Sequence, residues 1–117
     1  MRGTTVMKTV FEKIIDGELP CHKVFENDRI IAFKDIAPAA PVHILIVPKK
    51  HLKNISEATA EESELIAEAV LVATELARQF GIKDNFRLLT NNGALAGQSV
   101  FHWHFHLIGG RELGPVA

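Results

Sequence analysis

Three of the six histidines in the chain fall within five residues near the C-terminus, in the run His102-Trp103-His104-Phe105-His106. One bulky apolar residue separates each histidine from the next. Such strict alternation predicts a β-strand over residues 100–108, with the histidines on one face and the aromatic residues on the other. Because imidazole is a base, a nucleophile and a metal ligand near neutral pH, this row indicates chemistry rather than a solvated face.

Two kinds of chemistry suit this spacing. Neutral imidazoles coordinate zinc, but three alternate positions on one straight strand lie too far apart to close a tetrahedral site, and nearby carboxylates are scarce. The other chemistry is nucleophilic attack on phosphorus by the middle imidazole, while its neighbours neutralise the phosphoryl oxygens. The glycine-punctuated segment from Gly93 to Ser99 suits phosphate, because backbone amides and a hydroxyl can donate hydrogen bonds to it. The spacing favours phosphorus only slightly and leaves both chemistries open.

Several elements before the histidine run must position it. Apolar spacing predicts a short helix over residues 10–16, which Thr9 caps and Gly17 ends. Residues 22–26 and 29–34 flank Asn27-Asp28 and predict a β-hairpin. The apolar run over residues 42–47 predicts a central strand covered on both faces, in which His43 is expected to be a hydrogen-bonded structural histidine.

A capping box of Thr59 and Glu62 predicts the start of one long helix, which runs to about Phe80 and ends at Gly81. Its wide apolar stripe is expected to cover the sheet face that carries the aromatic residues of the histidine strand. Residues 86–91 predict the strand before that one. A short helix, several strands, a long helix and two more strands predict an α+β domain with an antiparallel sheet.

Composition sets the class of protein. The chain has 117 residues, 47% hydrophobic and 23% charged, which suits one soluble domain; we expect residues 1–8 to be an extension and residues 9–117 to be the domain. A net charge of −1 gives no electrostatic case for nucleic-acid or membrane-surface binding. The sequence shows no apolar run of membrane-spanning length and no signal-peptide pattern, and its single cysteine, Cys21, is consistent with a reducing cytoplasm.

The run His102 to Ile108 resembles the signature of the histidine triad (HIT) superfamily, in which histidines alternate with hydrophobic residues. Other segments resemble its Hint branch, the purine nucleoside phosphoramidases, over about residues 9–112. They are Ile14-Ile15, residues 33–38, Val47-Pro48-Lys49-Lys50-His51, residues 97–100 and Gly109-Gly110-Arg111. The resemblance implies a five-stranded antiparallel sheet with one long and one short helix, continued across a homodimer. It implies no metal and no cofactor.

The resemblance also implies roles for individual residues. His104 would be the nucleophile and form a nucleotidyl-histidine intermediate. His106 and His51 would lie close to the phosphate, and His102 would hold the strand and the nucleophile in place. The substrate-binding residues would be Gln98 and Ser99 at the α-phosphate and leaving group, Asn91 near phosphate and ribose, Asp35 at the ribose hydroxyls, and Phe33 and Ile36 at the purine base.

The implied activity is hydrolysis of the P–N bond of purine nucleoside 5′-phosphoramidates. Two alternatives stay open: a dinucleoside polyphosphate hydrolase of the fragile-histidine branch, and a purine-nucleotide-binding interaction protein. Gln98-Ser99 and Gly109-Gly110-Arg111 resemble Hint more closely. The C-terminal tail after Glu112 lacks the aromatic residue that some relatives place near the partner's active site, which bears on the choice of leaving group.

Overall fold

Strand β3 (Val42–Pro48) is the middle strand of a five-stranded antiparallel sheet in the computed structural model, which describes residues 7–117. The strands follow the spatial order β1-β2-β3-β5-β4. The other four are β1 (Lys23–Glu26), β2 (Ile30–Lys34), β4 (Phe86–Leu89) and β5 (Phe105–Gly109). This arrangement confirms the predicted five-stranded antiparallel sheet of an α+β domain, while its continuation across a homodimer stays a prediction.

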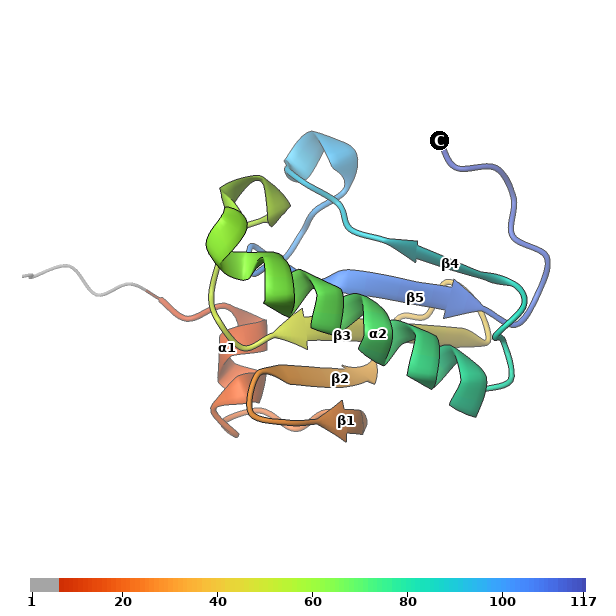
Figure 1. The fold of residues 1–117 in the computed structure, drawn as a ribbon, viewed down its shortest axis with the longest axis horizontal. Coiled ribbons are helices and arrows are strands. Elements are labelled where there is room, and N and C mark those ends of the chain that lie inside the picture. Colours follow the sequence, from red (N-terminus) through yellow and green to blue (C-terminus); the bar gives the residue numbers. More distant parts are fainter. Residues whose placement is uncertain (1–6) are drawn as a thin grey trace, which may run out of the picture.

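The two faces of the sheet carry different layers. Helix α2 (Ser63–Gln79) lies across one face, where its buried side chains pack with Ile44 and Ile46 of β3 and Leu107 of β5 (Figure 1). The neighbouring residues of β3, Leu45 and Val47, belong to a second cluster. Because side chains alternate along a strand, this second cluster lies on the opposite face. Both faces of β3 are therefore covered, as its unbroken apolar sequence predicts.

The second face is covered in part by helix α1 (Val10–Ile15). A capping box begins this short helix: the backbone N–H of Glu12 donates to Thr9 Oγ1, and that of Thr9 donates to Glu12 Oε1. Phe11 is buried and meets the ring of Phe33 edge-on, with 5.5 Å between ring centroids. Helix α1 thus brings an aromatic side chain onto the face opposite α2.

The long helix begins with the predicted capping box of Thr59 and Glu62, but its first turn is a 3₁₀ segment over Ala60–Glu62. The α-helix continues from Ser63 to Gln79, and Gly81 adopts a positive φ of 75° just beyond it. A glycine in this conformation ends a helix without the strain that a side chain would bring. The predicted limits of this helix are therefore close to the observed ones.

The histidine strand is shorter than predicted. β5 begins at Phe105, so His102 and His104 precede it. Pairing with β3 stops at Ile46 and Phe105, and the backbone N–H of Trp103 donates instead to Leu52 O at 2.9 Å. A ladder cannot continue past Pro48 in the usual way, because proline has no N–H to donate. The alternation of faces nevertheless persists: Phe105 packs with the α2 cluster, whereas His104 contacts Phe11 on the opposite face.

Residues 1–6 of the expected N-terminal extension lie outside the described residues. Lys8, the last residue of that extension, forms ion pairs with Asp16 and Glu18. Among residues 7–117, no helix has both the length and the apolarity to cross a membrane.

Candidate active site

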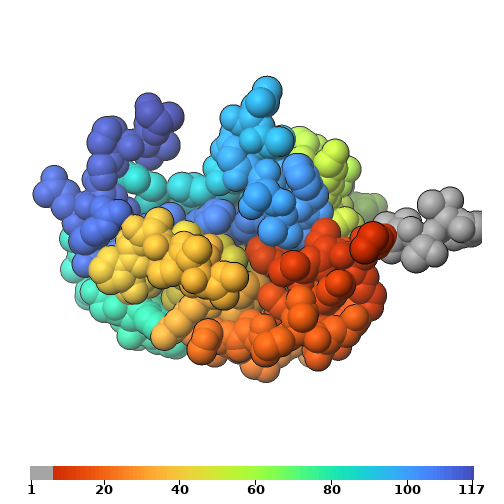
Figure 2. Space-filling view, turned by 180° about the vertical axis from the view of Figure 1, so that it is seen from behind, coloured from red at the N-terminus to blue at the C-terminus, as the bar shows by residue number. Residues whose placement is uncertain are grey.

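His43, His104 and His106 gather on the sheet face away from α2. Three parts of the chain meet there: helix α1, the segment between β2 and β3, and the residues that lead into β5 (Figure 2). Contacts between rings join them, since His104 touches Phe11 of α1 and His106 touches His43 of β3. The site is thus assembled from segments far apart in the sequence.

His104 is buried, with 7% of its surface exposed, and its Nδ1 lies 2.7 Å from the carbonyl oxygen of His102. A carbonyl oxygen only accepts hydrogen bonds, so Nδ1 must carry the proton and Nε2 must carry a lone pair. Burial lowers the pKa of His104, which keeps the ring neutral near pH 7. These conditions are those of an imidazole nucleophile.

The backbone of His104 is also held in place. Thr90, just after β4, donates its hydroxyl hydrogen to His104 O at 2.6 Å. The Phe11 ring stands edge-on to the His104 ring, with 4.8 Å between centroids and an angle of 86°. The position of His104, the predicted nucleophile, is therefore fixed by contacts with the end of β4 and with α1.

His106 is half-buried in β5, and its ring centroid lies 5.0 Å from that of His104. Burial, together with the neighbouring rings of His104 and His43, lowers the pKa of His106 to about 4. Two adjacent imidazoles are thus neutral together near pH 7. His104 therefore carries a lone pair on Nε2, and the neutral His106 ring can donate one hydrogen bond.

His102 is fully buried, and its Nε2 lies 2.7 Å from Pro48 O. The proton of the neutral ring is therefore on Nε2, and burial lowers the pKa of this residue too. Its main-chain carbonyl holds His104, while its ring anchors the segment to the end of β3. These contacts are compatible with the supporting role expected for His102, which stays a prediction.

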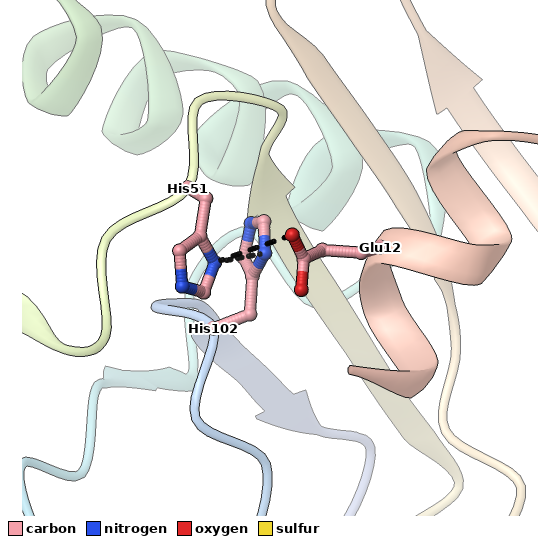
Figure 3. Close-up of side chains that lie close together, drawn as sticks. All are labelled: Glu12, His51 and His102. Carbon is pink, nitrogen blue, oxygen red and sulfur yellow. Dashed lines mark hydrogen bonds and ion pairs between the residues drawn. The ribbon is translucent and has the colours of Figure 1, made fainter. Parts of the chain in front are cut away.

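His51 lies against His102, with 3.1 Å between their Nδ1 atoms, and Glu12 Oε2 is 4.0 Å from His51 Nδ1 (Figure 3). The N–H of Thr9 donates to Glu12 and holds the pKa of its carboxyl below the usual range. Glu12 is therefore ionised beside the two rings. The predicted place of His51 close to the phosphate stays a prediction, because its observed contacts are with the supporting histidine.

Sequence reasoning missed the role of His43. It was expected to be a hydrogen-bonded structural residue, and it does accept the N–H of Ala39 on Nδ1 at 2.9 Å. Its Nε2, however, lies 2.9 Å from His106 Nδ1, which makes it a fifth histidine of the site, beside His51 and the three triad histidines. The signal in the sequence was faint: His43 and Leu45 share a face, and only the register that pairs Leu45 with His106 shows that this face carries the triad.

The loop before the triad is shaped by Gln98. This buried side chain accepts the N–H of Gly93 at 2.8 Å and donates to the carbonyls of Lys53 and Val100. Both of its amide hydrogens are therefore used, so Gln98 fixes the loop rather than offering the expected free donor to phosphate. Ser99 next to it is exposed, and half-buried Asn91 lies against Gly97. Their predicted contacts with substrate stay predictions.

The residues expected to bind the nucleoside differ in exposure. Asp35 is partly buried, accepts the N–H of Ala37 at 2.8 Å, and has Oδ2 3.5 Å from His43 Nε2. Ile36 beside it is 95% exposed, which leaves its side chain free to meet a flat base. Phe33 is only 4% exposed and packs with Phe11, so it supports the site from the core and has almost no surface with which to touch a base.

Within residues 7–117, two groups of side chains have donor atoms close enough for one metal ion. They are Glu12, His51 and His102, and Asp35, His43 and His106, each with its donor atoms within 4.8 Å of one another. In both groups, two ring nitrogens already face each other at hydrogen-bonding distance. A metal ion would have to replace those hydrogen bonds.

Cavity size does not mark this site. A cleft of about 840 Å³ lies elsewhere, between the segment that leads from α2 into β4 and residues 110–113. None of the residues that line it is a predicted site residue. The chemistry of the histidine face, rather than volume, identifies the candidate active site.

Comparisons with known proteins agree with this geometry. The model of the HIT domain matches residues 16–113. A HIT-like protein of Chlamydia pneumoniae is 53% identical over 109 residues, which cover 93% of this chain and 99% of that protein. The crystal structure of a HIT family hydrolase from Legionella pneumophila superposes with a TM-score of 0.90 at 42% identity, covering 92% of this chain and 96% of that one. A histidine triad nucleotide-binding protein from Candida albicans superposes with a TM-score of 0.78 at 28% identity, covering 94% of this chain and 86% of that one. The chain belongs to the HIT domain family.

Proposed function

We propose that this protein hydrolyses the P–N bond of purine nucleoside 5′-phosphoramidates, releasing the nucleoside monophosphate and an amine. One observation carries the proposal. The His104 Nδ1–H donates to the carbonyl of His102, which leaves Nε2 as an unprotonated nucleophile in a buried site. The similarity to a hydrolase from Legionella pneumophila supports a hydrolytic reaction, and the similarity to a nucleotide-binding protein from Candida albicans supports a nucleotide as the ligand.

The reaction has two steps. The lone pair of His104 Nε2 attacks phosphorus and forms a P–N bond, the bond from phosphorus to the amine breaks, and the leaving nitrogen takes up one proton. Water then attacks the nucleotidyl-histidine, giving up one proton and restoring the neutral ring. The sum is the addition of one water molecule to the phosphoramidate.

Neighbouring groups make these steps easier. His106, neutral at pH 7, donates a hydrogen bond to the charge that develops on the phosphoryl group. The exposed loop residue Ser99 adds its hydroxyl, while Asp35 and Ile36 hold the ribose and the base. Neither a metal nor a cofactor takes part, because the attacking group is a side chain.

The proposal includes a homodimer in the cytoplasm. Strand β4 is at one edge of the sheet, so a second copy can extend the sheet there and reach ten strands. Val70 and Leu71 are exposed on α2 and give that helix an apolar patch for the partner. Cys21 is a free cysteine, which suits a reducing compartment.

The test is hydrolysis of adenosine 5′-phosphoramidate by the wild type, His104→Ala and the control His22→Ala, with AMP binding measured on each. His22 is an exposed histidine before β1. We expect turnover by the wild type and the control, and loss of nearly all activity in His104→Ala with AMP binding retained. Binding of AMP by all three proteins with no release of amine would contradict the proposal and favour an interaction protein. Faster cleavage of diadenosine polyphosphates would favour the fragile-histidine activity.

A further inference from the structure

His43 has a place in the site that the proposed reaction does not use. It lies in β3 with only 9% of its surface exposed, opposite Ile108 of β5. Its ring is tilted 45° to that of His106, and Nε2 lies 2.9 Å from His106 Nδ1. Two neutral imidazoles can form such a bond in only two ways, because one nitrogen must donate and the other must accept.

The partner on the other side of His43 decides between them. The backbone N–H of Ala39 points at His43 Nδ1 at 2.9 Å. A backbone N–H only donates, so Nδ1 must be the unprotonated nitrogen and Nε2 must carry the proton. Nε2 also has Asp35 Oδ2 at 3.5 Å, an acceptor that favours a proton at the same nitrogen.

Ala39 is itself held in place. The guanidinium of Arg111, just beyond β5, donates to Ala39 O at 2.8 Å. Gly110 lets the chain turn there with a φ of 99°, where its backbone approaches Pro41. The loop that orients His43 is therefore tied to the strand that carries His106.

We propose that His43 is a positioning residue that fixes the tautomer of His106. Because His43 Nε2–H donates, His106 Nδ1 accepts, and the single proton of neutral His106 is on Nε2. That N–H is the only hydrogen-bond donor that the neutral His106 ring can offer to a phosphoryl oxygen. The main-chain N–H of Ala39 thus sets the direction of the hydrogen bond between His43 and His106. Through that bond it also determines which nitrogen of His106 carries the proton.

The direct test is the ¹⁵N spectrum of histidine-labelled protein without substrate at pH 7.5, for the wild type, His43→Gln and His43→Leu. Glutamine can place an N–H near the position of His43 Nε2, whereas leucine has no donor. His106→Gln assigns the resonances of His106, and His22→Ala is the control. We expect the Nε2–H tautomer of His106 in the wild type and in His43→Gln, and averaged tautomers in His43→Leu.

Two results would overturn the proposal. One is a wild-type spectrum in which His106 carries its proton on Nδ1 or exchanges between both nitrogens. The other is an unchanged His106 spectrum in a folded His43→Leu protein. The wild-type spectrum decides the point even if the leucine variant fails to fold.

The consequence for catalysis rests on the proposed function and is measured separately. We expect His43→Leu to lower kcat by roughly 10- to 100-fold, less than the 10²–10³ lost when a donor to a developing oxyanion is deleted. KM for adenosine 5′-phosphoramidate should change little, and His43→Gln should recover most of kcat. If the wild type shows the expected tautomer but no phosphoramidase activity, the proposed function fails and the tautomer assignment stands. An equal loss of kcat in the glutamine and leucine variants would contradict the positioning role.

Discussion

The ring of His104 donates its Nδ1 proton to the carbonyl oxygen of His102, the residue two positions before it, at 2.7 Å. The two residues lie where the chain has not yet entered β5, so this carbonyl is free to accept a side chain. The backbone of the triad thus sets which ring nitrogen of His104, the proposed nucleophile, carries the proton. A regular strand through His102 would have used that carbonyl in the ladder.

Replacing His102 tests this support. His102→Ala removes a fully buried ring and leaves Pro48 O without the N–H that now donates to it. We expect a loss of about 2–4 kcal/mol in the free energy of unfolding, from the cavity and the unpaired carbonyl. Urea denaturation measures the loss, and exposed His22→Ala should stay within about 0.5 kcal/mol of the wild type. A His102→Ala protein as stable as the wild type would show that the ring does not anchor the segment.

The stability of the fold should depend on pH through His106. Its pKa is about 4 in the native protein and near the ordinary value of 6.5 when the chain unfolds. Between these values the unfolded chain binds more protons, so the free energy of unfolding falls as pH is lowered from about 6.5 to about 4. The loss from this residue is on the order of 3 kcal/mol. Denaturation curves measured across this pH range should show that the free energy of unfolding depends less steeply on pH in His106→Gln than in the wild type. An equal pH dependence in the two proteins would contradict the lowered pKa.

Gly109 allows β5 to lie close to the turn after α2. A Cβ added there would come within 2.9 Å of Ile82 Cδ1 and 3.1 Å of Asn85 O. Gly109→Ala should therefore lower the free energy of unfolding by about 1–3 kcal/mol, because the clash includes a backbone atom. Gly114→Ala is the matched control, since a Cβ at Gly114 meets nothing within 4 Å. Thermal unfolding of the two variants would show equal midpoints if the close approach were unimportant.

Removal of metal ions should leave the activity intact. The proposed nucleophile is an imidazole, and in each of the two possible metal groups the histidine nitrogens face each other at hydrogen-bonding distance. We expect the same kcat before and after dialysis against EDTA, with metal content measured in both samples. A loss of activity that stoichiometric Zn²⁺ restores would favour the zinc site that the triad spacing left open.

Much of this fold could be predicted because its signals are local. The capping box of Thr59 and Glu62, the stop at Gly81 and the unbroken apolar run of β3 each need only a few neighbouring residues. The shared face of His104 and His106 likewise follows from alternation, and the family resemblance added the expected role of each. Local rules were enough for these features.

The features that local rules missed depend on pairing between distant segments. The role of His43 requires the register of β3 against β5, and the short β5 depends on Pro48 at the end of its partner strand. Gln98 was expected to contact phosphate, but its amide is used by the backbone of Gly93, Lys53 and Val100. The burial of Phe33 follows from helix α1, whose Phe11 covers it. Such contacts appear only when the chain is folded.

The nucleophile assignment is tested most directly by trapping the intermediate. An excess of protein is mixed with adenosine 5′-phosphoramidate, and the reaction is quenched in alkali at times from milliseconds to completion. Peptide mass spectrometry then locates any adduct on the protein. We expect a transient adenylyl group on His104 that forms as amine is released and decays as AMP appears. The same adduct should form in His22→Ala and be absent from His104→Ala. Complete turnover with no adduct at any time, or an adduct on another residue, would contradict the assignment of His104 as the nucleophile.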